Sequence, residues 1–128
     1  MTTGGMLESA ARIAMSGIFV SGGWAAYREP GARPEQASAL GLPRPELAVR
    51  ANGLAMAAGG AALGVGILPR LAAGGLICSL VATTLAGHPF WNVDDPAARA
   101  QQRTQFLKNL GLIGGLLMVI AAARRDAA

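Results

Sequence analysis

Polar side chains that could do chemistry gather at the ends of apolar segments in this 128-residue chain. His88, the single histidine, ends one such segment, and Thr84 lies one helical turn before it on the same face. A histidine there could hydrogen-bond a quinone carbonyl or relay a proton. It could equally be an ordinary helix-end residue, because the helix dipole favours its protonated form. The other candidates for one shared polar pocket open or follow neighbouring apolar segments: Arg50, Asn52, Trp91, Lys108 and Asn109.

Arg50, His88 and Cys78 also have to be considered for an ion pair, a metal or haem site and thiol chemistry. Glu46 precedes Arg50 by four residues, a spacing that allows an ion pair within one helix. A single histidine cannot provide bis-histidine haem ligation, and no carboxylate has ligand spacing to it, so we expect no metal site. Cys78 is the only cysteine, which excludes an intramolecular disulfide or dithiol mechanism, and we expect its thiol to pack as a small apolar group.

The composition indicates that lipid is the solvent for much of the chain. Hydrophobic residues make up 52% and charged residues only 14%, against about 25% charged in soluble domains. So few charges cannot cover a soluble fold of this size, which excludes an ordinary soluble enzyme and a disordered tail. The basic residues lie between and beside apolar segments rather than on one face with aromatics, so we expect no nucleic-acid partner.

Four apolar segments predict an all-α, integral membrane four-helix bundle that forms one domain over residues 1–128. We predict helices at about 9–27, 47–68, 70–88 and 104–123. The second and fourth segments fit best the roughly 20 residues that a membrane crossing needs. The tight link at 68–71 makes the second and third an antiparallel hairpin. The first segment could instead be a cleaved signal peptide, although Glu8 and Trp24 argue against that alternative.

The two long connectors differ in kind. Residues 28–46 contain four prolines, which exclude a continuous helix, but 33–42 could form a short interfacial helix. Residues 92–96 predict a turn, followed by a polar helical run into the last segment. The charges of this second connector are candidates for docking a partner protein: Asp94, Asp95, Arg99 and Arg103. Seven basic residues on the connector side against four on the other favour cytoplasmic connectors, but several of the seven could be buried partners, so the orientation stays open.

Small residues four apart predict close contacts between the helices. Gly60 and Gly64 form such a pair in the second segment, and Gly111 and Gly115 form another in the fourth. Membrane helices associate through small residues because lipid is as apolar as leucine. The pattern favours packing within one chain, with a homo-oligomer as the alternative.

Several stretches of the chain together resemble the DoxX family, over about residues 8–122. They are Arg12-Ile13-Ala14 with Gly22-Gly23, Arg50-Ala51-Asn52-Gly53, Pro69-Arg70, Gly87-His88-Pro89-Phe90-Trp91 and Phe106-Leu107-Lys108-Asn109-Leu110. The resemblance implies a small multi-pass protein of the bacterial inner membrane. The wider group includes a subunit of thiosulfate:quinone oxidoreductases. Many relatives have a glutamate in the second helix where this chain has Asn52, which weakens a proton-relay role there.

These observations favour a non-catalytic membrane subunit or anchor of a redox or sulfur-detoxification complex. Its expected partners are the lipid bilayer and a peripheral redox protein, with no certain cofactor. The alternative is a quinone-binding subunit of an oxidoreductase, and a third reading is a binding protein for lipid or another small hydrophobic ligand. Both alternatives would use the polar pocket, since the predicted topology brings its residues to one side of the membrane.

Overall fold

The computed structural model describes residues 2–128, and every regular element in that range is helical. The all-α class is therefore confirmed. The expected total of four helices is wrong, because the first long connector forms a helix of its own. The α-helices are α1 (Thr3–Arg28), α2 (Arg33–Ala39), α3 (Pro45–Val65), α4 (Pro69–Gly87) and α5 (Pro96–Ala127), and a 3₁₀ turn, η1 (Phe90–Asn92), follows α4.

The additional helix, α2, forms between two chain reversals. Gly31 and Gly41 flank it with φ of 57° and 81°, in the left-handed region that glycine adopts without steric cost. Pro34 lies in its first turn, where a missing N–H removes no intrahelical hydrogen bond. The prolines of the connector therefore interrupt a long helix but permit this short one.

Prolines and capping groups set the ends of the long helices. Pro45, Pro69 and Pro96 each occupy the first position of a helix. The Asp95 carboxylate accepts a hydrogen bond from the Ala98 N–H at 2.9 Å, so α5 begins well before residue 104 and has a polar first part. α3 ends before residue 68, because Gly66 turns into the left-handed conformation.

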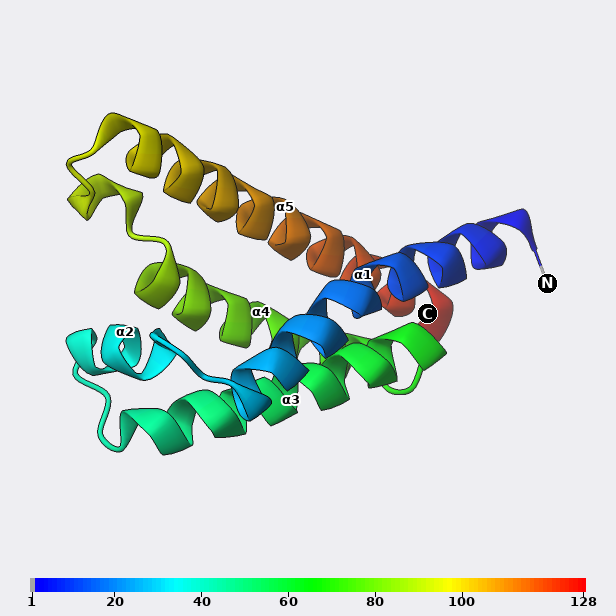
Figure 1. The fold of residues 1–128 in the computed structure, drawn as a ribbon. Helices are drawn as coiled ribbons and strands as arrows, with labels where there is room; N and C mark the ends of the chain where they lie inside the picture. Colours follow the sequence, from blue (N-terminus) through cyan, green and yellow to red (C-terminus); the bar gives the residue numbers. More distant parts are fainter. Residues whose placement is uncertain (1) are drawn as a thin grey trace.

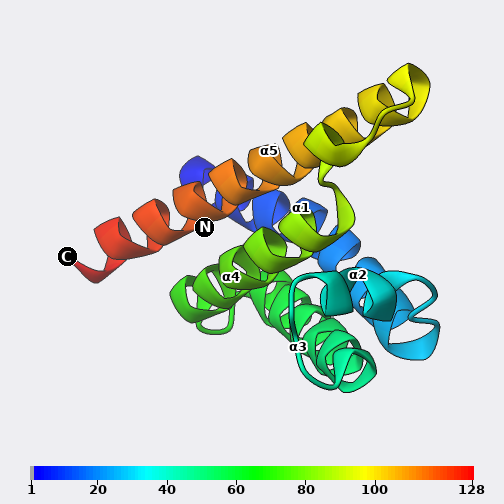
Figure 2. The same ribbon diagram turned by 90° about the vertical axis from the view of Figure 1, so that its left-hand side faces the viewer.

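The helices pack in neighbouring pairs. α1 lies along α3, while α4 packs against both α3 and α5 (Figure 1). α2 contacts α3 and α4, and it lies at the end of the molecule opposite the chain termini (Figures 1 and 2). The buried core joins the four long helices and consists of Phe19, Leu63, Ala73, Leu76, Leu80 and Leu116.

Glycines allow α1 and α3 to approach each other closely. A Cβ atom added to Gly23 would lie 2.5 Å from the Gly53 carbonyl oxygen, and one added to Gly53 would lie 2.6 Å from the Gly23 carbonyl oxygen. Backbone therefore lies where either side chain would begin. Neither glycine was among the four expected to form helix contacts.

The four expected packing glycines differ in their surroundings. An added Cβ would lie 2.8 Å from Phe19 Cβ at Gly60, and 2.8 Å from Ser16 Oγ at Gly64. Both positions therefore lie against α1. Gly115 faces the Met15 sulfur in the same way, whereas Gly111 has open space beside its Cα.

Two segments are long and apolar enough to cross a membrane, Pro69–Asn92 and Pro96–Ala127. α1 and α3 fall short of that apolar character because Arg12 interrupts α1, Arg50 and Asn52 interrupt α3, and glycines occupy many of the remaining positions. The sequence had favoured the second segment, now α3, over the third. Both α1 and α3 nonetheless expose large apolar side chains, among them Ile13, Trp24 and Leu54. Exposed apolar side chains in such number mark a surface that contacts lipid or another protein.

Candidate functional site

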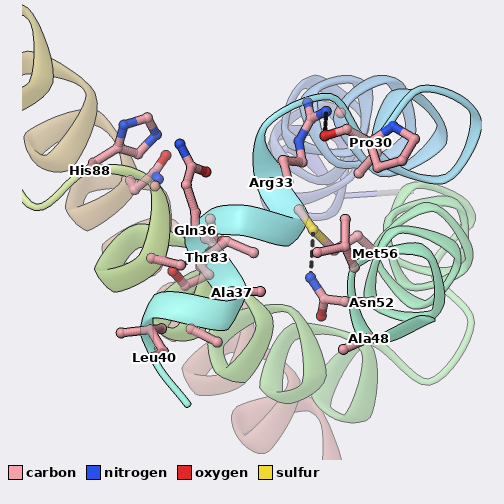
Figure 3. A pocket seen from close by; sticks show the side chains of 18 of the residues that line it. Pro30, Arg33, Gln36, Ala37, Leu40, Ala48, Asn52, Met56, Thr83 and His88 are labelled. Carbon is pink, nitrogen blue, oxygen red and sulfur yellow. Dashed lines mark hydrogen bonds between the residues drawn. The ribbon is translucent and has the colours of Figure 1, made fainter. Parts of the chain in front are cut away.

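A cavity of about 630 Å³ lies between the helices at the end of the molecule that α2 covers. All five helices contribute to its wall, for example through Ala26, Gln36, Asn52, Leu80 and Asn109. Figure 3 shows part of this lining, including Gln36 of α2 and Asn52 of α3. Its volume lies within the range of roughly 300–1,000 Å³ that is usual for small-molecule sites.

The lining combines polar and apolar side chains. Arg33 and Gln36 of α2 line the outer part together with His88 and Gln102. The inner part is formed mostly by apolar side chains from the middle of the long helices, Phe19, Met56, Leu80 and Leu112, with the polar Asn52 and Asn109 among them. Because a helix rises 1.5 Å per residue, Leu112 lies about 15 Å along α5 from Gln102. The cavity thus suits a molecule with a polar head and an apolar body.

His88 stands where α4 ends, and its ring is held by α5. Its Nδ1 atom lies 2.6 Å from Oε1 of Gln102. With the amide oxygen as acceptor, Nδ1 carries the proton, and Nε2 remains to accept a hydrogen bond or, in the protonated ring, to donate one. The Gln36 side chain lies beside His88 (Figure 3). A ligand head could therefore contact two polar groups at this point.

Two asparagines connect helices at the wall of the cavity. The Asn109 amide donates a hydrogen bond to the Thr84 hydroxyl at 2.9 Å, and both residues are buried. Asn109 lines the cavity, whereas Thr84 does not. The Asn52 side-chain oxygen accepts a hydrogen bond from the Ser79 hydroxyl at 2.9 Å. These bonds join α4 to α5 and α3 to α4, so they fix the spacing of the walls.

Four of the seven residues expected to share a polar pocket line this cavity: Asn52, His88, Lys108 and Asn109. Arg50 does not, because its guanidinium pairs with Glu46 at 3.1 Å and donates to the Tyr27 carbonyl at the end of α1. Trp91 is half exposed and packs edge-to-face on the rings of Phe90 and Phe106.

Sequence reasoning missed the contribution of α2. Arg33, Gln36, Ala37 and Leu40 all line the cavity. Their spacing, i, i+3, i+4 and i+7, is the repeat of one helix face, so the signal was present in the connector. Gln102 was also missed, although it lies in the polar helical run that the sequence indicates before the last apolar segment.

The residues expected to dock a partner lie outside the cavity. Asp95 caps α5, and the Arg99 guanidinium donates to the Val93 carbonyl at 2.6 Å, so both stabilise the turn before α5. Asp94 and Arg103 are exposed. Within residues 2–128, no group of three or more metal-ligating side chains is placed to hold an ion.

Cys78 lies in a second hollow, of about 560 Å³, between α3 and α4. Its walls are small or apolar side chains, including Gly59, Gly75 and Leu71. The thiol is exposed rather than enclosed by the protein. This hollow lacks the charged side chains of the first cavity, so the first is the better candidate site.

Comparison with known proteins supplies one match. A family model described as DoxX matches residues 7–89, well over half of the chain. The matched part extends from α1 through the end of α4 and includes His88. No curated protein and no solved structure matches the chain.

Proposed function

The chain belongs to the DoxX family of membrane proteins, and from that premise we propose that it binds a small hydrophobic molecule in the cavity beneath α2. The family match over residues 7–89 confirms the resemblance to DoxX, and the motif at 106–110 lies outside the matched part. The combination of polar side chains near α2 with mostly apolar side chains between the long helices carries the proposal. Quinones and lipids both have this division between head and body.

The proposed setting is the bacterial inner membrane, crossed four times. The four long helices contain 26, 21, 19 and 32 residues, against the roughly 20 that a crossing needs. Their outward apolar side chains would contact lipid, and α2 would lie at one interface above the cavity. A ligand body could then enter from the bilayer, while its head stays near His88 at the depth of the headgroups.

Blocking the cavity tests this function. Ala48 lines the cavity on α3, and Ala51 on the same helix is exposed and outside it. Native mass spectrometry of the protein in nonionic detergent should detect one bound molecule of a decyl-tailed benzoquinone. The Ala48→Phe variant should lose this adduct, and the Ala51→Phe variant should retain it. Equal retention in both variants would contradict binding in this cavity.

A second proposed role is that of a non-catalytic membrane subunit in an oxidoreductase complex. The first turns of α5 stand apart from α1 and α3 in both views of the fold (Figures 1 and 2). Arg99 and Arg103 in these turns are exposed. A peripheral redox protein could dock there. Co-purification of a partner should be lost with Asp94→Asn combined with Arg103→Gln. It should survive Arg124→Gln at the opposite end, and survival in both variants would exclude this docking surface.

A further inference from the structure

Two basic side chains and no carboxylate line the cavity. Arg33 of α2 and Lys108 of α5 line it, and no Asp or Glu among residues 2–128 does. Building on the ligand-binding function proposed above, we infer that the cavity takes an amphiphile whose head is an anion, such as a carboxylate or a phosphate.

The charges of both side chains are left without a counter-ion. The Arg33 guanidinium donates to the carbonyl oxygens of Glu29 and Pro30, at 3.1 and 3.4 Å. The Lys108 ammonium donates to the side-chain oxygen of Gln105 at 2.8 Å. All of these acceptors are neutral, and both cations have further donors to offer. Arg50, which does pair with a carboxylate, lies outside the lining.

Neutral hydrogen-bond donors accompany these cations. The Gln36 side-chain amide lies beside His88 (Figure 3), and it has no hydrogen-bond partner within residues 2–128. Arg33 and Lys108 are both exposed, so their donors are accessible to a ligand. An anionic head could accept hydrogen bonds from this amide and from these cations.

The depth of the cavity indicates that the anion carries an apolar body. Phe19, Met56 and Leu112 line the inner part, where a free anion would find mostly apolar surface and the neutral Asn52 amide beside Met56. A free phosphate and a lipid-like anion share the same head chemistry, but only the second would fill the inner part. The occupant is therefore expected to be an acidic amphiphile.

Matched probes that differ only in the charge of the head test the inference. Native mass spectrometry in nonionic detergent would compare dodecanoate, its methyl ester and inorganic phosphate. Dodecanoate should bind at least about tenfold more tightly than the ester, as expected for a charge-assisted hydrogen bond. Phosphate alone should bind far more weakly. Arg33→Gln and Lys108→Gln should each reduce the difference in affinity between dodecanoate and its methyl ester. Arg103 is exposed and outside the lining, so Arg103→Gln should leave that difference unchanged.

The outcomes separate this inference from the function on which it rests. Equal affinity for dodecanoate and ester would overturn the anionic head and leave hydrophobic ligand binding in place. Binding of neither probe would overturn both proposals. Phosphate binding as tight as that of dodecanoate would indicate a free-anion site instead. Both single variants should first be shown to be monodisperse on gel filtration. If the full difference in affinity between dodecanoate and its ester persists in both, these cations do not recognise the head.

Discussion

The hydrogen bond between Thr84 and Asn109 ties α4 to α5 at the wall of the cavity, and both partners are buried. Asn52 makes a comparable link between α3 and α4 through Ser79. A buried amide without a partner costs more than the bond contributes. These asparagines therefore position helices as well as line the site, so their substitution affects folding before it affects chemistry.

Removal of the Thr84 hydroxyl should destabilise the protein. Thr84→Val leaves the buried Asn109 amide without an acceptor, which should lower the free energy of unfolding by about 1–3 kcal/mol. The Thr83 hydroxyl bonds back to the Ser79 carbonyl of its own helix, so Thr83→Val should cost less. Thermal unfolding in one detergent would compare them, and equal losses would contradict a role for Thr84 in joining the helices.

His88 should affect ligand binding more than stability. His88→Ala removes one hydrogen bond to the head and should weaken binding of the decyl-tailed benzoquinone about fivefold. Gln102→Leu should weaken it as well, because the amide oxygen that holds Nδ1 is lost. Titrations followed by native mass spectrometry would measure both effects. Unchanged binding in Gln102→Leu would show that Gln102 does not orient the ring.

At the scale of the elements, the α1–α3 pair is the most constrained part of the fold. Its backbones meet at Gly23 and Gly53, where an added Cβ would overlap the facing carbonyl oxygen. A backbone, unlike the end of a flexible side chain, cannot move aside cheaply. This pair also sets the position of α2, which follows α1 and packs on α3.

Adding one methyl group to α1 should have opposite effects on stability at a crowded and at an open glycine. Gly23→Ala should lower the free energy of unfolding by about 1–3 kcal/mol, as for other overpacked sites. Gly17→Ala, on the same helix with nothing within 4 Å of its Cβ position, should stabilise the protein by up to about 1 kcal/mol. Unfolding midpoints would give the signs. A neutral Gly23→Ala would contradict the close approach.

Much of the helical framework could be predicted from the sequence, because prolines and charged residues separate the apolar segments. α2 was harder to predict with certainty. A helix of seven residues is too short to be stable by propensity alone, and it depends on contacts with α3 and α4 that a sequence does not display. The polar helical run predicted after the turn at 92–96 belongs to α5, and the Asp95 cap fixes the point at which that helix begins.

The candidate site was partly predictable for a similar reason. His88, Lys108 and Asn109 lie where helices begin or end on one side of the predicted topology, and the structure places all three in one lining. Arg50 lies at the same end of the molecule, but its guanidinium bonds to Glu46 and to the Tyr27 carbonyl and does not line the cavity. The position of a residue along its segment predicts the end of the molecule at which it lies, but not the partner that its side chain selects.

At the scale of the whole molecule, the two ends differ in chemistry. One end has α2 and the cavity, and the other has both termini together with Arg70, Arg124 and Arg125. Four crossings would place these ends on opposite sides of the membrane. This arrangement keeps both termini on one side and the head of a ligand on the other.

Labelling of single cysteines should reveal that topology. In a Cys78→Ala background, Ser38→Cys reports on α2, and Arg125→Cys reports on the end of α5. In cells whose outer membrane has been removed, a membrane-impermeant maleimide should label only one of these two cysteines. After the inner membrane is permeabilised, it should label both. Labelling of both from the same side would contradict the four-crossing arrangement, and the background protein serves as the blank.

The central claim is that the cavity beneath α2 holds an amphiphile in the native membrane. The most direct measurement is to extract the protein with its surrounding lipid and identify every small molecule that remains bound after exchange into nonionic detergent. One amphiphile should remain bound to the unchanged protein and to Ala51→Phe, and it should be lost from Ala48→Phe. Retention of the same molecule by Ala48→Phe, or of none by the unchanged protein, would contradict binding in this cavity.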